Sequence, residues 1–222
     1  MGLDIYYNPA SQPSRSVAMF VKLNKIEHND KVVNLFKGEN KTPEYLAMNP
    51  SHTVPVMNDD GFIICQSPAI VKYLADKCKT ADHWYPSDLK KRAKVNELLD
   101  WQHTNIRKHG SGVFFNIKLG PLFGLPPMTP EQVDEKYKEL DGSLTLIEGF
   151  LKDQQFLCGD EITIADLFIA NEVLQPTMCE RDIYENHPKV KAWMDRVRER
   201  LNPVWGEMVG VFEQIVSGIG SG

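Results

Sequence analysis

The segment that decides the fold runs from Asn49 to Leu74 and reads NPSHTVPVMNDDGFIICQSPAIVKYL. Its residues 54–57 predict a short apolar strand that contains a proline. The polar run at 58–61 has the composition of a hairpin turn and ends in a glycine that can take a positive φ. Residues 62–65 predict a second strand, and their unbroken apolarity indicates burial on both faces.

Two features of this segment point to a ligand. Proline cannot donate to a sheet ladder, so the strand with Pro55 is expected to present an edge there, where an extended peptide-like ligand can pair. Gln66 and Ser67 precede a helix with Pro68 in its first turn, and a helix N-terminus favours a carboxylate. An edge-strand proline and an N-capping serine would explain the same residues without a ligand.

Composition limits the class of protein. A chain of 222 residues that is 42% hydrophobic can form one large or two small domains with a buried core. The net charge of −5 and the absence of basic runs disfavour a nucleic-acid surface. The four cysteines show no C-x-x-C pair or metal-like spacing and are expected to be reduced thiols. The N-terminal residues resemble neither a signal peptide nor a membrane span, so we expect a cytoplasmic protein.

The N-terminal third predicts alternating strands and helices. A strand at 3–7 leads into a helix that starts at Ser11-Gln12-Pro13, and a second strand follows at 31–36. Thr42-Pro43 then opens a short helix before the segment described above. The resulting order, β-α-β-α-β-β-α with parallel first strands, is typical of a thioredoxin-like domain, which we place at residues 1–79.

The rest of the chain predicts helices. A linker at 80–87 is followed by an all-helical domain at 88–222, which begins with one long helix from Leu89 to Gly110. Thr163 and Asp166 form the pattern of a capping box before an almost wholly apolar helix. We expect this helix to be the core of the second domain.

This organisation resembles the cytosolic glutathione S-transferases, and the theta class in particular. The match covers nearly the whole chain and rests on five segments in the right order. They are similar to the theta-class active-site turn (Ser11 to Arg15), the cis-proline segment (Val54-Pro55), the γ-glutamyl-binding pair (Gln66-Ser67), the start of the helical domain (His83 to Pro86 and Trp101 to Thr104) and the capping-box segment (Gly159 to Asp166).

The resemblance implies the roles of individual residues. Ser11 is the expected catalytic residue, and a cis peptide bond before Pro55 would turn the Val54 backbone toward the cysteinyl part of glutathione. Thr104 and Arg107 are expected near the electrophile or the sulfur, although Arg107 could equally be part of a solvated helix face. The residues expected to bind glutathione are Asn40, Lys41, His52, Thr53, Val54, Pro55, Gln66 and Ser67.

Three of these positions depart from the theta pattern. Theta enzymes commonly carry histidine and lysine where this chain has Asn40 and Thr53, and an acidic residue where it has Gln66. The run from His52 to Pro55 is closer to the insect delta and epsilon pattern, in which such a histidine contacts the glycyl carboxylate. Lys41 and His52 are the nearest basic residues that could replace the missing ones.

Serine chemistry limits what Ser11 can do. Its hydroxyl is too weak an acid to ionise near neutral pH and therefore cannot act as a base. Its expected role is to donate a hydrogen bond to the glutathione sulfur. A free thiol has a pKa near ~8.5. A charged hydrogen bond contributes ~1.5–3 kcal/mol and a helix N-terminus up to ~1 kcal/mol, which together lower that pKa by about one to two. The alternative role for Ser11 is that of a plain N-cap.

The resemblance therefore implies a glutathione transferase that is a cytoplasmic homodimer. Its substrates would be small hydrophobic electrophiles such as alkyl or aralkyl halides and organic peroxides, with a possible peroxidase side activity. Glutathione is the expected co-substrate, and no metal, other cofactor, nucleic acid or membrane partner is expected. The alternative is a non-catalytic structural or scaffolding protein of the same fold.

Overall fold

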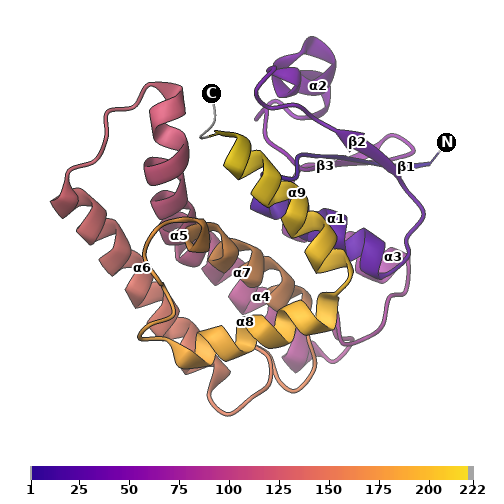
Figure 1. Ribbon diagram of the computed structural model, residues 1–222. Coiled ribbons are helices and arrows are strands. Elements are labelled where there is room, and N and C mark those ends of the chain that lie inside the picture. The colour runs from indigo at the N-terminus through magenta and orange to yellow at the C-terminus, as the bar shows by residue number, and fades with distance from the viewer. Residues whose placement is uncertain (1, 220–222) are drawn as a thin grey trace. The chain divides into compact units, whose positions relative to one another are not determined.

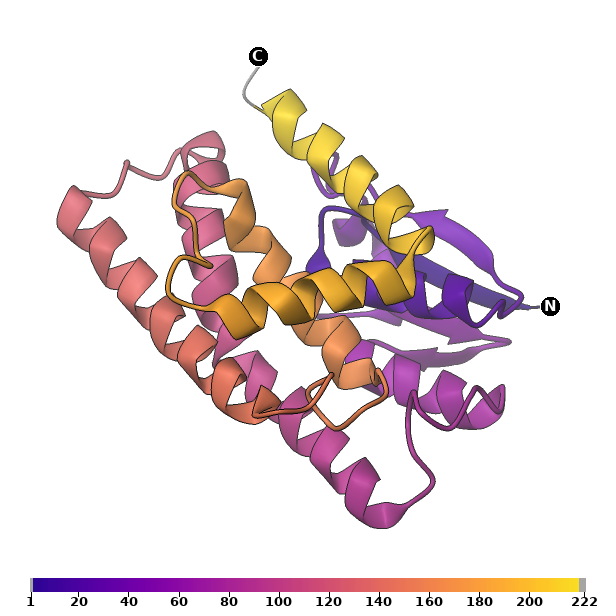
Figure 2. The same cartoon turned by 60° about the horizontal axis from the view of Figure 1, so that its bottom comes forward.

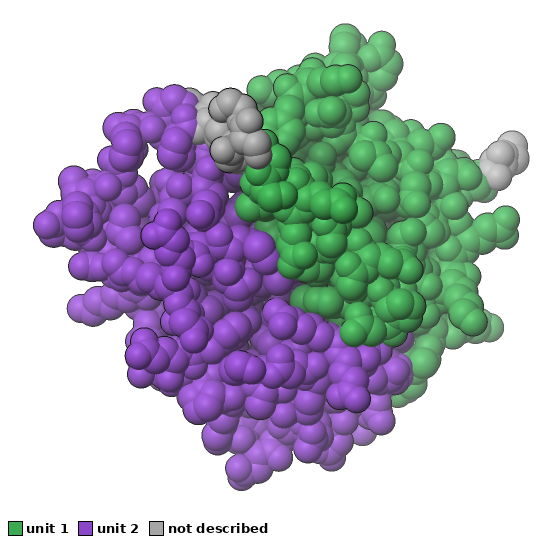
Figure 3. Space-filling model, in the orientation of Figure 1, with its two compact units in different colours: residues 1–82, 201–222 green, residues 83–200 purple. Residues whose placement is uncertain are grey.

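The computed structural model describes residues 2–219, except for the side chains of 122, 123 and 219. The chain forms two compact units (Figure 3). The first unit joins the residues up to 82 with those from 201 onward, and the second unit consists of residues 83–200. The last helix is therefore part of the same unit as the N-terminal sheet.

A four-stranded sheet with the order β2-β1-β3-β4 is the centre of the first unit. Its strands are β1 (Leu3–Tyr7), β2 (Asn29–Val32), β3 (Val56–Asp59) and β4 (Phe62–Ile64). β1 pairs with β2 in parallel and with β3 antiparallel, and β3 and β4 form an antiparallel hairpin. The predicted parallel pair is thus confirmed.

Four helices complete this unit, α1 (Gln12–Leu23), α2 (Pro43–Met48), α3 (Ser67–Lys77) and α9 (Val204–Ile219), with a 3-10 turn at Glu39–Lys41. Figure 1 shows α1 and α3 on one side of the sheet and α2 on the other. The predicted apolar face of α1 is fully buried. The thioredoxin-like order predicted from the sequence is confirmed.

Three predictions about the strands are wrong. β3 is a central strand rather than an edge. The proline is tolerated because Pro55 lies just before the first residue of β3, where the ladder does not need the missing N–H. β4 is the edge strand, and Phe62 and Ile63 are 54% and 37% exposed instead of buried on both faces. The apolar side chain of Phe62 on this edge strand packs beside the Tyr73 ring. The second strand was predicted at residues 31–36, but β2 spans Asn29–Val32 because its pairing ends level with the end of β1.

The turn between β3 and β4 follows its predicted chemistry. Asp60 has a φ of 50° and Gly61 a φ of 96°, which are the left-handed values that a two-residue hairpin turn requires. Asn58 Oδ1 also accepts a 2.7 Å hydrogen bond from the Gly61 amide. The hairpin predicted from residues 58–61 is therefore present.

The second unit is helical (Figures 1 and 2). Its helices are α4 (Leu89–Thr104), α5 (Ile106–Phe114), α6 (Pro130–Leu151), α7 (Ile164–Leu174) and α8 (Pro188–Leu201). A π-helical turn at Phe115–Leu119 and 3-10 turns at Gly120–Phe123 and Gln175–Met178 connect them. The predicted combination of a thioredoxin-like and an all-helical fold is confirmed.

The predicted single helix from Leu89 to Gly110 is wrong. The chain breaks at Asn105, where φ is −116° and ψ is −99°, so that α4 and α5 are separate helices. Gly110 lies inside α5 because α7 passes close to it: a Cβ on Gly110 would lie 3.1 Å from the Glu172 carbonyl oxygen. This glycine permits close helix packing and does not end a helix.

The predicted capping box at the start of α7 is present. Thr163 Oγ1 accepts from the Ala165 amide, and Asp166 accepts from the Thr163 amide at 2.9 Å. The buried Asp166 carboxylate also accepts from the Leu157 amide and the Trp193 indole N–H. It thereby ties the start of α7 to α8 and to the preceding loop. Every residue of α7 is buried, which confirms it as the core helix.

No helix within residues 2–219 is long and apolar enough to cross a membrane.

All four cysteines are free thiols, as expected. Burial raises the pKa of the Cys158 thiol to about 12 and that of Cys179 to about 11, so neither is a thiolate near neutral pH.

Candidate functional site

The strand register brings the predicted glutathione-binding segments to one end of the sheet strands. β1 ends there and leads into α1, while β3 starts there, with Tyr6 opposite Val56. β4 ends there too, with Ile64 opposite Met57, and leads into α3. The start of α1, the loop before β3 and the start of α3 therefore lie together.

Ser11 is positioned as the N-cap of α1, but its hydroxyl makes no capping hydrogen bond to the helix. Its backbone is extended, with φ −85° and ψ 120°, and the residue is partly exposed. A plain N-cap would use the hydroxyl to satisfy an amide of the first turn. The geometry thus leaves this hydroxyl for another partner at the positive end of a 12-residue helix.

The turn that carries Ser11 is held by Asn8. The Asn8 carbonyl accepts from the Ser11 amide at 3.0 Å, and its side-chain Oδ1 accepts from the Ala10 amide at 2.9 Å. Asn8 Nδ2 donates in turn to the Val33 carbonyl at 2.8 Å. One buried side chain therefore links the turn to the chain beyond β2.

Three buried side chains hold the loop before β3, and we call Asn40, Tyr45 and Asn49 the carbonyl clamp. Asn40 Nδ2 donates to the His52 carbonyl at 2.6 Å. The Tyr45 hydroxyl and Asn49 Nδ2 both donate to the Thr53 carbonyl, at 2.7 and 2.8 Å. Burial raises the pKa of Tyr45, which keeps its phenol a donor. The clamp fixes the backbone immediately before the Val54–Pro55 peptide bond, which is cis.

Around this loop the predicted glycyl-site residues fall into two groups. Lys41 and His52, which has a φ of 46°, are exposed, and the clamp holds His52 by its backbone carbonyl and not by its side chain. Asn40 is buried and directs its amide at the His52 carbonyl, and Thr53 Oγ1 accepts from Asn49 Nδ2 at 3.1 Å. The basic side chains of Lys41 and His52 are therefore exposed, whereas the side chains of Asn40 and Thr53 make hydrogen bonds within the loop.

The predicted γ-glutamyl pair lies at the start of α3. Gln66 is the N-cap, is exposed and makes no capping hydrogen bond, while Ser67 is the buried first residue of the helix. The N-terminus of this 11-residue helix offers backbone amides and a favourable dipole to a carboxylate.

Thr104 and Arg107 belong to the second unit. Thr104 is the exposed last residue of α4. Arg107 lies in the first turn of α5, with its Nε 4.0 Å from Oε1 of the buried Glu172 on α7. Glu172 also accepts from the Ser111 hydroxyl at 3.3 Å. The Arg107 side chain is 33% exposed and lies within ion-pair distance of a buried carboxylate.

Sequence reasoning missed the residues that support the site, namely Asn8, Tyr45 and Asn49. One local signal was present: Asn49 precedes Pro50, and its Oδ1 accepts from the Ser51 amide at 3.1 Å, which is an Asx turn. The role of Tyr45 depends on a contact with Thr53 across a loop, and no local pattern announces it.

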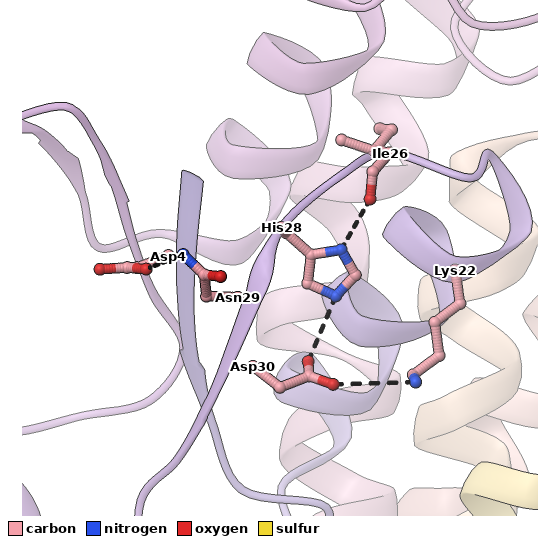
Figure 4. Close-up of polar contacts among 6 residues, drawn as sticks. All are labelled: Asp4, Lys22, Ile26, His28, Asn29 and Asp30. Atoms are coloured by element: carbon pink, nitrogen blue, oxygen red, sulfur yellow. Dashed lines mark hydrogen bonds and ion pairs between the residues drawn. The ribbon is translucent and has the colours of Figure 1, made fainter. Parts of the chain in front are cut away.

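A separate polar cluster lies around the start of β2 and includes Asp4, Lys22, His28, Asn29 and Asp30 (Figure 4). His28 Nε2 lies 3.2 Å and Lys22 Nζ 3.8 Å from the Asp30 carboxylate, and Asn29 Nδ2 donates to Asp4 at 2.8 Å. Asp4 pairs with Asn29 at the end of the sheet where β1 begins, which is the opposite end from Ser11. We assign this cluster to the stability of β2. Within residues 2–219 no group of acidic, histidine and cysteine residues could hold a metal ion.

Comparison with known proteins defines the class to which this fold and site belong. The family model for the glutathione S-transferase N-terminal domain matches residues 10–77, and that for the C-terminal domain matches residues 115–200. The chain is 39% identical to mouse glutathione S-transferase theta-3 over 202 residues, which cover 90% of this chain and 84% of the relative. This chain belongs to the glutathione S-transferase family.

Solved structures specify the class further. Human glutathione transferase theta-2, crystallised with glutathione and an unknown ligand, aligns with a TM-score of 0.92 and 36% identity over 97% of this chain and 89% of that one. A delta-class glutathione transferase from Nilaparvata lugens aligns with a TM-score of 0.84 and 31% identity over 98% and 99% of the two chains. The theta-like resemblance and the enzyme class predicted from the sequence are confirmed.

Proposed function

We propose that this protein conjugates glutathione to small electrophiles and that the Ser11 hydroxyl stabilises the glutathione thiolate. The observation that carries the proposal is the Ser11 side chain, which makes no capping hydrogen bond although it lies at the N-cap of α1. A hydrogen bond from this hydroxyl to the sulfur, together with the helix dipole, favours the charged form of the thiol. The thiolate then displaces a leaving group or attacks a peroxide oxygen.

The remaining predicted residues are proposed to bind the tripeptide. The Val54 backbone before Pro55 pairs with the cysteinyl part, and Gln66 and Ser67 at the start of α3 receive the γ-glutamyl end. His52 and Lys41 bind the glycyl carboxylate, because they are exposed and basic. Asn40 and Thr53 act by shaping the loop. The theta-2 structure with glutathione supports this assignment of the ligand.

The second unit is proposed to bind the electrophile. Arg107, anchored by Glu172, supplies a positive charge for the sulfur or a leaving group, and Thr104 a hydroxyl. The substrates are small apolar halides and organic peroxides. The homodimer and the cytoplasmic location remain predictions of the same resemblance, and the domain limits at 79 and 88 remain predictions from the order of elements along the chain.

The test is the pH dependence of the thiolate absorbance of bound glutathione, in the wild type and in Ser11→Ala. We expect a bound-thiol pKa about one to two below that of free glutathione, and a rise toward the free value in the variant. Ser14→Ala is the matched control, because its buried hydroxyl lies in the same helical turn and has no hydrogen-bond partner. Glutathione binding without a lowered pKa would favour the non-catalytic scaffold instead.

A further inference from the structure

Arg15 is a fully buried arginine one turn into α1 from Ser11. Its Nη1 donates to the Pro9 carbonyl at 2.9 Å and to the Ala10 carbonyl at 3.2 Å. Its backbone amide donates to the Ser11 carbonyl at 2.9 Å. Three hydrogen bonds from one residue therefore converge on the three residues that end in the proposed catalytic serine.

The C-terminal helix covers this guanidinium. The Arg15 guanidinium carbon lies 4.1 Å from the centroid of the Phe212 ring, and Phe212 is fully buried in α9. α9 packs against α1 within the same unit (Figure 1). A guanidinium over an aromatic face is an attractive contact that also limits where the guanidinium can move.

We propose that Arg15 is a positioning residue for Ser11 and that Phe212 holds Arg15 in its working position. This inference rests on the proposed role of Ser11. The direction of the Ser11 hydroxyl depends on the backbone of residues 9–11, which Asn8 holds from the sheet side and Arg15 from the helix side. A small displacement of a hydrogen-bond donor lowers the stabilisation of a charge steeply, so α9 influences thiolate formation through this chain of contacts.

The test uses Arg15→Lys and Phe212→Leu. Lysine keeps the positive charge but loses the planar guanidinium, whose Nη1 donates to both carbonyls and which lies over the Phe212 ring. Leucine keeps an apolar side chain but loses the ring. We expect both variants to raise the pKa of bound glutathione toward the free value. We also expect kcat to fall by about tenfold while KM for glutathione stays within about twofold, because the binding residues are untouched.

Val209→Ala is the matched control, since Val209 is also buried in α9 but has no aromatic ring to place over Arg15. It should keep the wild-type thiol pKa at a free energy of unfolding similar to that of Phe212→Leu. A wild-type thiol pKa in Phe212→Leu, or an equal rise in Val209→Ala, would overturn the proposal. If Arg15→Lys does not fold, Phe212→Leu alone decides.

The Ser11→Ala variant separates this inference from the proposed function. An unchanged thiol pKa in Ser11→Ala refutes serine activation itself. A raised pKa in Ser11→Ala combined with unchanged values in Arg15→Lys and Phe212→Leu leaves serine activation intact and refutes only the role of Arg15 and Phe212.

Discussion

At the scale of single residues, Tyr45 shows how the site depends on side chains that need not touch the ligand. Its hydroxyl donates to the Thr53 carbonyl at 2.7 Å from a position that is almost fully buried. Loss of that donor leaves the carbonyl with Asn49 Nδ2 as its remaining clamp partner. The loop that ends in the proposed Val54 contact then has more freedom.

We therefore expect Tyr45→Phe to raise KM for glutathione about fivefold while kcat is little changed. The lost hydrogen bond is worth about 1 kcal/mol, and a looser loop weakens binding by a similar amount. Steady-state kinetics with varied glutathione measures both constants. Tyr73→Phe is the control, because it removes a hydroxyl bound to Asp59 in the β3–β4 hairpin and should leave KM unchanged.

At the scale of elements, the turn after α6 contains a strained residue. Lys152 has φ 47° and ψ −116°, and the Gln154 amide donates to the Leu151 carbonyl at 2.7 Å. These are the features of a type II′ turn with lysine at the position where glycine is preferred. The Cβ of Lys152 therefore adds strain that glycine would avoid.

Lys152→Gly is expected to raise the free energy of unfolding by about 0.5–1.5 kcal/mol. Relief of the strain, about 1–3 kcal/mol, exceeds the entropy that a new glycine adds to the unfolded chain. Chemical denaturation measures the change. Lys152→Ala keeps the Cβ and should give no gain, so an equal gain in both variants would show that strain at this residue is not the cause.

Elements with local signals were those that the sequence predicted well. The caps at Thr42 and Thr163 and the glycine of the β3–β4 turn act within a few residues, and each is present. The errors came from tertiary context. Nothing near Pro55 shows that β3 is central, and the break at Asn105 lies inside a continuous helical pattern. The carbonyl clamp could not be predicted because it joins residues up to 12 positions apart.

At the scale of the whole molecule, stability is expected to depend on His109, which joins α5 to α6. Its Nδ1 lies 2.8 Å from the hydroxyl of the buried Ser143. Burial lowers the pKa of His109, and Lys108 and Lys136 lower it further, while Glu139 opposes them. The folded protein therefore binds a proton at this residue less readily than the unfolded chain does.

The sign of the pH effect follows. Above the unfolded-state pKa of about 6.5 His109 is neutral in both states, and its full contribution to stability is present. That contribution is lost as the pH falls from about 6.5 through the lower folded-state pKa. We expect His109→Gln to reduce the decline in unfolding free energy between pH 7 and pH 5, measured by urea denaturation. An unchanged slope would contradict this assignment.

The position of α9 in the first unit also has a consequence for the order in which the protein matures during synthesis. The ribosome makes α1 among the first residues and α9 among the last of those described, and translation at about 5–20 residues per second separates them by about 10 to 40 s. Until α9 emerges, Arg15 has no Phe212 ring above it. Helix α1 therefore remains without this cover until residues 204–219 have been made, so the contact between Arg15 and Phe212 is among the last of the first unit to form.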